Sequence, residues 1–276
     1  MKEITIMAAG ELISGKTSFL NALLGEEIFP NGEKGWSPAT RTTIELHYGD
    51  CKRAYACFRN PNPMPKDYTA ALTSDMQNQI KNYKYSDMIP PISFDWDDLP
   101  EHILSEAGEK NVPIDNFYLS APNSFLKDGI CLIDTKGYVV ENTNNYSLKK
   151  YLSKPDILLF FISADQMILK EDIIDFSNSQ KDFLSLNIAP GSWKYLCFVI
   201  TNLDQIQKNT DQLRISQALP ALLHRYIPNL PYRIYYARPD YAYAAEVKGM
   251  KELLPLSGLA NIKIDLYTMI DQIRHK

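Results

Sequence analysis

Residues 10–17 near the start of the chain read G-E-L-I-S-G-K-T and fit the pattern G-x-x-x-x-G-K-S/T, the phosphate-binding P-loop. The two glycines let the backbone curl so that successive N–H groups point at phosphate oxygens. The helix that follows adds its positive N-terminal end. Lys16 can reach the terminal phosphates of a nucleotide, and the hydroxyl of Thr17 can bind Mg²⁺. The pattern predicts that five residues hold the nucleotide phosphates: Gly10, Ser14, Gly15, Lys16 and Thr17.

Two further segments carry groups that can complete a Mg²⁺ site and contact the terminal phosphate. Asp134 follows an apolar run, and a carboxylate there can hold a water of the Mg²⁺ shell. Gly137 can bring its N–H close to the γ-phosphate because it has no Cβ. In residues 37–42 we expect Thr40 to add a hydroxyl to the metal, from a loop that orders only around a triphosphate. The alternatives are an ordinary aspartate cap and an ordinary threonine-rich turn.

Residues 201–204, T-N-L-D, follow another apolar run and resemble the N/T-K-x-D sequence that GTP-binding proteins use to recognise the base. The carboxylate of Asp204 would accept hydrogen bonds from two guanine nitrogens, which adenine cannot supply, and a mismatched buried polar pair costs about 1–3 kcal/mol. A surface turn after a strand is the alternative. After a later run, residues 237–238 can present backbone to the guanine oxygen. Together these segments give the expected base contacts: Thr201, Asn202, Asp204, Ala237 and Arg238.

The elements that must position these groups alternate between strand and helix. Short apolar runs predict strands at 4–9, 117–119, 130–133, 156–163, 195–200 and 233–236. Helical patterns cover 18–24, 168–186, 212–226 and 262–273. Residues 42–48 and 53–58, on either side of Gly49 and Asp50, are predicted to form a hairpin. The order predicts an α/β fold, the three-layer P-loop NTPase (GTPase) fold, with a mostly parallel central sheet and helices on both faces. Ligands of such sheets bind at the C-terminal ends of the strands.

The strand signal fades between residues 61 and 111, where helices are predicted at 67–83 and 97–107. The sheet pattern resumes afterwards, so we interpret this segment as an insertion in a single domain that spans residues 1–276. The pattern ends with the last helix, and we expect no stalk or membrane domain within this chain.

Composition narrows the class of protein. With 29 Lys and Arg against 33 Asp and Glu, the net charge of −4 argues against a broad nucleic-acid-binding face. The four cysteines have no C-x-x-C spacing, which indicates a reducing compartment and no cysteine metal site. No signal-peptide pattern is seen in the first residues of this sequence, and the longest apolar run, 157–162, is far too short to span a bilayer. We expect a cytoplasmic protein whose only membrane contact is peripheral, at the inner face of the membrane.

Together these segments resemble the GTPase domain of the dynamin superfamily, in particular that of bacterial dynamin-like proteins. The resemblance includes F-L-N-A-L-L-G at 19–25, L-H-Y-G at 46–49, the approach from 121 to 134, S-A-D-Q at 163–166 and S-G-L at 257–259. It spans nearly the whole chain outside the insertion.

The resemblance implies Mg²⁺-dependent binding of GTP and GDP, and hydrolysis of GTP. Lys16, Thr40 and Gly137 would be the catalytic residues, with a water as nucleophile, and Thr17, Thr40 and Asp134 the metal ligands. Such domains pair face to face across the nucleotide, here with a second copy or with a related dynamin-like protein. Full-length relatives remodel membranes through regions outside this domain.

Three positions depart from the family pattern. Ile13 stands where many dynamins have a serine that holds a charge-compensating cation, and Asn202 replaces the lysine that stacks on the base. Lys136 replaces the usual proline, and its charge lies either near the γ-phosphate or in solvent. Loss of charge compensation slows phosphoryl transfer. The alternatives to a GTPase are therefore a nucleotide-gated dimerisation or binding module with little turnover, and a P-loop enzyme acting on another nucleotide.

Overall fold

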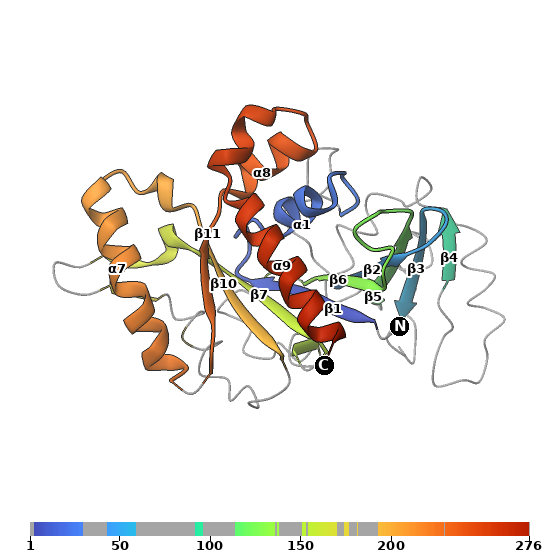
Figure 1. The fold of residues 1–276 in the computed structure, drawn as a ribbon, viewed down its shortest axis with the longest axis horizontal. Helices are drawn as coiled ribbons and strands as arrows, with labels where there is room; N and C mark the ends of the chain where they lie inside the picture. The colour runs from blue at the N-terminus through green and yellow to red at the C-terminus, as the bar shows by residue number, and fades with distance from the viewer. Residues whose placement is uncertain are drawn as a thin grey trace, which may run out of the picture.

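The computed structural model describes residues 3–29, 43–58, 92–95, 114–135, 137, 151–152, 154–169, 174–176, 181, 193–228 and 230–275. A nine-stranded sheet runs through the described part in the order β11-β10-β7-β1-β6-β2-β5-β3-β4 (Figure 1). One half is parallel throughout: β1 (Ile4–Gly10), β6 (Ile130–Asp134), β7 (Ile157–Ser163), β10 (Tyr195–Thr201) and β11 (Arg233–Tyr236). The other half is mixed: β2 (Thr43–Tyr48), β3 (Arg53–Phe58), β4 (Ile92–Asp95) and β5 (Ile114–Ala121).

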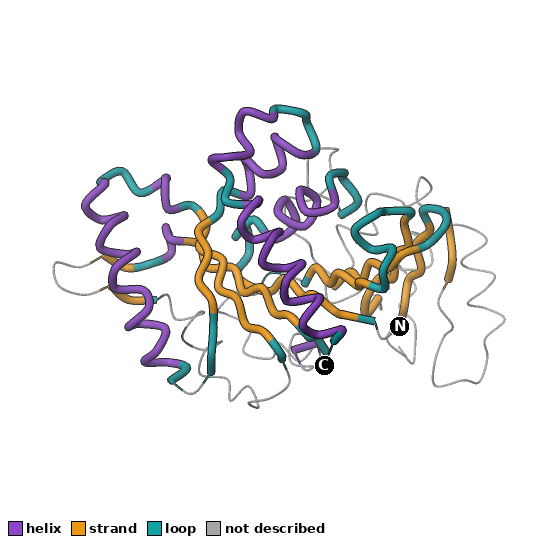
Figure 2. Tube along the Cα trace, viewed as in Figure 1, coloured by secondary structure: helices purple, strands orange, loops and turns teal. Residues whose placement is uncertain are grey.

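Two separate cores lie on the two faces of this sheet. Successive side chains of a strand point to opposite faces, so in β1 Ile6 and Ala8 join one core while Met7 and Ala9 join the other. The first core packs under α1 (Lys16–Leu24), α8 (Pro239–Glu246) and α9 (Leu259–Arg274). The second packs under α7 (Asn209–Tyr226). Figure 2 shows α9 lying across the central strands, with α7 beside the edge formed by β10 and β11. The expected α/β sheet with helices on both faces is confirmed.

The spacing of apolar residues explains how α7 docks. Ile215, Leu219 and Leu223 recur every four residues and are fully buried, so they form one stripe against the second core. Helix α1 ends at a glycine cap. Gly25 adopts the left-handed conformation, and its N–H donates to the carbonyl groups of Asn21 and Ala22.

The hairpin predicted for residues 42–58 is wrong. Strand β5 lies between β2 and β3, parallel to the first and antiparallel to the second. The connection crosses the end of β5, where the Gly49 N–H donates to Ala121 O at 3.1 Å and the Ser120 hydroxyl donates to Cys51 O at 3.2 Å. Because β5 is rich in buried apolar side chains, it is better placed inside the sheet than at its edge.

The helix predicted for residues 168–186 is wrong at its start. Ile168–Leu169 (β8) and Ile174–Asp175 (β9) pair as two short antiparallel strands. The side chain of Phe176 follows into the second core and packs on Tyr226 of α7, with ring centroids 5.8 Å apart. Residues 177–180 and 182–186 lie outside the described residues.

Three other elements differ from the sequence prediction. Strand β4 extends the sheet beside β3, although no strand was predicted within residues 61–111. The helices predicted at 67–83 and 97–107 lie outside the described residues. Helix α8 and the 3₁₀ segment Lys251–Leu256 were not predicted, although Pro239 at the first position of α8 is a recognised helix-start signal.

Candidate functional site

The predicted site segments gather at one edge of the sheet. In the parallel half of the sheet, β1, β6, β10 and β11 run in the same direction, so their C-terminal ends share an edge. The loops that leave these ends carry the P-loop residues, Asp134, the 201–204 segment and the 237–238 segment. This is the edge where open α/β sheets bind ligands.

The P-loop is shaped by residues with positive φ. Gly10 has φ 145°, and a Cβ on it would lie 2.3 Å from the carbonyl oxygen of Phe161, so only glycine fits. Gly15, with φ 86°, starts α1. Ile13 has φ 60°, which is rare for a β-branched residue, and its side chain is 72% exposed. The Ile13 side chain therefore faces solvent, and it carries no atom that could coordinate a cation.

The Lys16 ammonium lies inside the loop. It donates to the carbonyl oxygen of Gly10 at 3.3 Å, to Ser14 Oγ at 3.3 Å, and to the carbonyl oxygen of Glu11. Ser14 is buried and its hydroxyl donates to Glu11 O at 2.8 Å, so its side chain faces the loop interior. Burial lowers the pKa of Lys16 to about 8, against the opposing pull of the carboxylates of Asp134 and Glu11. A phosphate is a better partner for this cation than neutral carbonyl groups are.

The two groups assigned to Mg²⁺ touch each other. Thr17 Oγ1 donates to Asp134 Oδ2 at 2.7 Å, and the Asp134 side chain is fully buried. Thr135 holds the end of β6 against β1, because both its hydroxyl and its N–H donate to Ala8 O, at 2.9 and 3.2 Å. A hydroxyl and a carboxylate side by side match the oxygen ligands that Mg²⁺ prefers. These residues fit the implied cation.

Gly137 lies against the P-loop, as its predicted role requires. A Cβ on Gly137 would be 2.8 Å from the Leu12 nitrogen and 2.6 Å from the Leu12 Cα. The backbone of Gly137 thus lies in close contact with the P-loop backbone at Leu12. Thr40 and Lys136 lie outside the described residues, so their roles remain predictions.

The 201–204 segment is tied to the P-loop at its start. The Thr201 hydroxyl donates to Ser14 O at 3.1 Å in a buried position. Asn202 has φ 56°, and its amide donates to Ser163 Oγ at 2.6 Å. The side chain that replaces the stacking lysine is therefore turned toward the end of β7, where the Ser163 hydroxyl in turn donates to Asp165.

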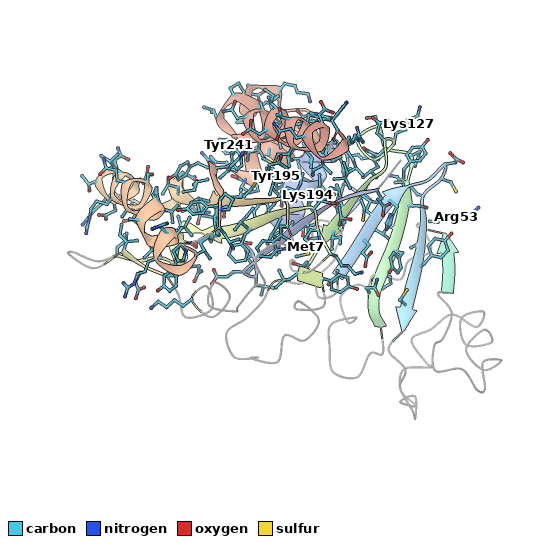
Figure 3. The ribbon with its side chains drawn as sticks, turned by 60° about the horizontal axis from the view of Figure 1, so that its bottom comes forward. Met7, Arg53, Lys127, Lys194, Tyr195 and Tyr241 are labelled. Carbon is cyan, nitrogen blue, oxygen red and sulfur yellow. The ribbon has the colours of Figure 1, made fainter. Side chains whose placement is uncertain are left out.

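Asp204, the residue predicted to select guanine, faces a cation of its own chain. Arg238 Nη2 lies 2.9 Å from Asp204 Oδ2 and 3.6 Å from Asp240 Oδ2. The Arg238 guanidinium also stacks on Tyr241, with 3.3 Å from Cζ to the ring centroid, on the α8 side of the molecule (Figure 3). A guanidinium presents a fork of N–H donors, as guanine does along the edge that Asp204 was predicted to bind.

The backbone N–H groups of the 237–238 segment are engaged within the protein. The Ala237 N–H donates to Ile200 O and the Arg238 N–H to Ser257 O, both at 2.9 Å. The sequence placed this segment at the site but missed the Arg238 side chain, as well as Thr135 and Ser163. The available signal was position alone, since Ser163 ends a predicted strand and Thr135 and Arg238 each lie two residues after one.

Comparison with known proteins agrees with this arrangement. The model of the dynamin family matches residues 6–203, which include the P-loop, Asp134 and Thr201. The chain belongs to the dynamin family. Among curated proteins, this dynamin-family chain is 24% identical over 161 residues to a bacterial dynamin-like protein from Nostoc punctiforme. That alignment covers 58% of this chain and 20% of the relative.

Two solved structures of an oligomerised bacterial dynamin pair, described as sensing and tethering membranes over long range, share the fold of this domain. Each superposes with a TM-score of 0.66, at 20% and 19% identity, over 96% and 97% of this chain. The chain covers 37% and 44% of those two chains, so it spans less than half the length of each of these relatives. No helix among the described residues has the length and apolar character needed to cross a bilayer.

Proposed function

We propose that this dynamin-family GTPase domain binds GTP and GDP together with Mg²⁺ and hydrolyses GTP slowly. The contact between Thr17 and Asp134 carries the proposal. It places a hydroxyl and a buried carboxylate beside Lys16, at the strand ends where such sheets bind ligands. Thr17 and Asp134 would hold Mg²⁺, which would supply positive charge against the negative charge that develops during phosphoryl transfer.

Each residue of the P-loop has a distinct role in this proposal. Lys16 exchanges its carbonyl partners for phosphate oxygens, and the N–H groups of the curled loop, with that of Gly137, hold the β- and γ-phosphates. Thr17 and Asp134 hold the cation and its water shell. Thr40 adds a hydroxyl when the triphosphate is bound and helps to position the attacking water.

Base selection rests on Asp204. Its carboxylate is exposed enough to reach a ligand and already contacts one guanidinium nitrogen, Nη2 of Arg238. Guanine would replace that partner with two N–H donors, whereas adenine has no matching pair of donors. Thr201 keeps the base segment in a fixed position relative to the phosphate loop through its bond to Ser14 O.

A second function, a nucleotide-gated dimerisation module with little turnover, is favoured by Ile13. Its side chain is exposed and cannot hold a cation. Under either function the domain would pair with a second copy or a related dynamin-like protein, in the cytoplasm and peripherally at a membrane reached through other regions. The oligomerised pair formed by its structural relatives supports this assembly.

Phosphate release measured against protein concentration separates these functions. A GTPase activated by pairing gives a specific activity that rises with protein concentration. Tight GTP binding without release at any concentration identifies the gated module. Preference for ATP over GTP would contradict the assignment of Asp204 and indicate another P-loop enzyme.

A further inference from the structure

Three metal-ligating side chains meet at the end of the sheet opposite the nucleotide site. Glu3 precedes β1, His47 lies near the end of β2, and Cys131 is the second residue of β6. Leu46 pairs with Leu132, so the antiparallel register of β2 and β6 brings His47 beside Cys131. Gly10 and Asp134 lie at the other ends of β1 and β6, and the cluster is therefore separate from the phosphate site.

The three side chains form a continuous chain of contacts. Glu3 Oε1 lies 2.9 Å from His47 Nδ1, and Cys131 Sγ lies 3.6 Å from His47 Nε2. One ligand atom from each residue lies within 4.8 Å of the others. Tetrahedral zinc with Zn–N of about 2.0 Å and Zn–S of about 2.3 Å holds its nitrogen and sulfur ligands about 3.5 Å apart. The spacing of Cys131 and His47 already matches that value.

We propose that Cys131 Sγ and His47 Nε2 bind one thiophilic divalent cation, with Zn²⁺ the best match, and that Glu3 orients the imidazole from its other nitrogen, Nδ1. Thiolate and imidazole suit zinc better than Mg²⁺ or Ca²⁺, which take oxygen ligands. Cys131 is buried and fixed by the strand, while His47 and Glu3 are partly exposed and open a path for the ion. Water would complete the coordination of the ion.

A role for Cys131 as a bare nucleophile or redox thiol is disfavoured. Burial, followed by the negative charges of Glu3 and Glu45, raises the pKa of the Cys131 thiol far above its usual range. Glu45 is itself buried and paired with Lys154, with Oε1 2.9 Å from Nζ.

The three residues come from distant parts of the sequence, which explains why cysteine spacing gave no metal site. The ion would join β2 to β6, and Glu3 ties the start of β1 to His47. Because β6 also carries Asp134 at its other end, a metal bound to Cys131 would fix the position of a strand that contributes to the proposed nucleotide site. The proposed cation does not depend on GTP binding, so the two proposals can fail separately.

The chain offers matched control thiols. Cys197 is equally buried in the same sheet, but its sulfur lies 3.9 Å from Met269 Sδ, and neither His nor a carboxylate contacts it in the described structure. Cys51 is exposed and controls for loose binding at the surface.

The test titrates the metal-free protein with Co²⁺ and then with Zn²⁺, in excess Mg²⁺, and follows the thiolate-to-cobalt charge-transfer absorption. We expect a saturable band at one equivalent that Zn²⁺ removes. Cys131→Ser and His47→Ala should abolish it, Glu3→Gln should weaken binding at least tenfold, and Cys197→Ser and Cys51→Ser should leave it unchanged.

His47→Ala guards against misfolding, since His47 is partly exposed and its loss spares the core. The oxygen ligands Thr17 and Asp134 give no such band, so cobalt at the nucleotide site is not mistaken for the cluster. Absence of a band in the wild-type protein, or a band that survives in both Cys131→Ser and His47→Ala, would overturn the proposal.

Discussion

The two ends of the proposed nucleotide site are built differently. At the phosphate end Lys16 and Asp134 are almost fully buried, and the backbone of the P-loop surrounds the ammonium. At the base end Asp204 and Arg238 form an ion pair that is 41% and 30% exposed, and Asn202 is bonded to Ser163. The phosphate end is therefore preassembled, whereas the base end must exchange an internal partner for the ligand. Binding strength should depend mainly on the first end and selectivity on the second.

The largest effect is expected from Lys16→Met. We expect GTP affinity to fall at least tenfold, which is about 1.4 kcal/mol or more, because the cation for the phosphates is lost. The nucleotide-free protein should become more stable by about 1–3 kcal/mol at pH 7, since a buried charge with a pKa of about 8 is removed. Calorimetric titration and thermal unfolding measure the two effects, with Lys127→Met as a surface control. Unchanged affinity would show that the P-loop does not bind phosphate.

The next effect is expected from Asp204→Asn at the base end. Replacing the carboxylate by an amide removes one acceptor, so affinity for GDP should fall by about 1–3 kcal/mol, roughly tenfold to a hundredfold. Affinity for xanthosine diphosphate should rise, because the amide can donate to the extra carbonyl group of xanthine. Competition binding assays measure the affinities for GDP and for xanthosine diphosphate. Equal losses for both nucleotides would instead indicate a general structural defect.

Nucleotide affinity should also depend on pH through Lys16. Because its pKa in the free protein is about 8, Lys16 is charged below that pH and loses its proton above it, while bound phosphates keep it charged. Lys16 should therefore add no pH dependence to nucleotide affinity below pH 8. Above pH 8 it should lower the affinity by up to about tenfold per pH unit. Binding at pH 9 should take up a proton, which titrations in buffers of different ionisation enthalpy detect. The same slope in Lys16→Met would assign the dependence to another group.

The same group affects folding with the opposite slope. Its pKa is lower in the folded protein, about 8, than the ordinary 10.5, so the unfolded chain binds more protons between these values. The cost of burying the charge is complete below pH 8 and disappears toward pH 10.5, so this group makes the nucleotide-free protein more stable as pH rises through that window. Denaturant unfolding at pH 7.5 and pH 10, compared between wild type and Lys16→Met, isolates the contribution.

The smallest effect is expected from Arg238→Gln. Partly exposed ion pairs contribute up to about 1 kcal/mol, so removing the internal partner of Asp204 should tighten GDP binding by at most about fivefold. Arg233→Gln, which breaks a similar pair with Asp265 away from the site, should leave binding unchanged. Weaker GDP binding in Arg238→Gln would instead show that Arg238 stabilises the GDP-bound state more than the nucleotide-free state.

The sequence predicted those parts of the fold that depend on local pattern. The buried parallel strands, α1 and α9 were identified because their apolar runs and helix signals are contained within each segment. The partner of a strand is a non-local property, and for that reason the β2–β3 hairpin was wrong. Residues 168–175 combine helical spacing with β-branched side chains, and packing of Phe176 on α7 decided in favour of strands.

The candidate site divides in the same way. The P-loop and Asp134 carry recognisable residue spacings, so the phosphate end could be predicted from the chain alone. The Arg238–Asp204 pair and the Thr201–Ser14 contact join segments that only the fold brings together. Ile13 departs from the family pattern, and the structure gives it a positive φ and an exposed apolar side chain.

We propose above all that this domain binds guanine nucleotides through a preassembled phosphate site. Calorimetric titration of the purified chain with GTP, GDP and ATP, with and without Mg²⁺, tests it most directly. We predict saturable binding of GTP and GDP at one equivalent, at least tenfold tighter than ATP, with GTP binding weakened when Mg²⁺ is removed. Equal affinity for GTP and ATP, or no binding of either, would contradict the claim.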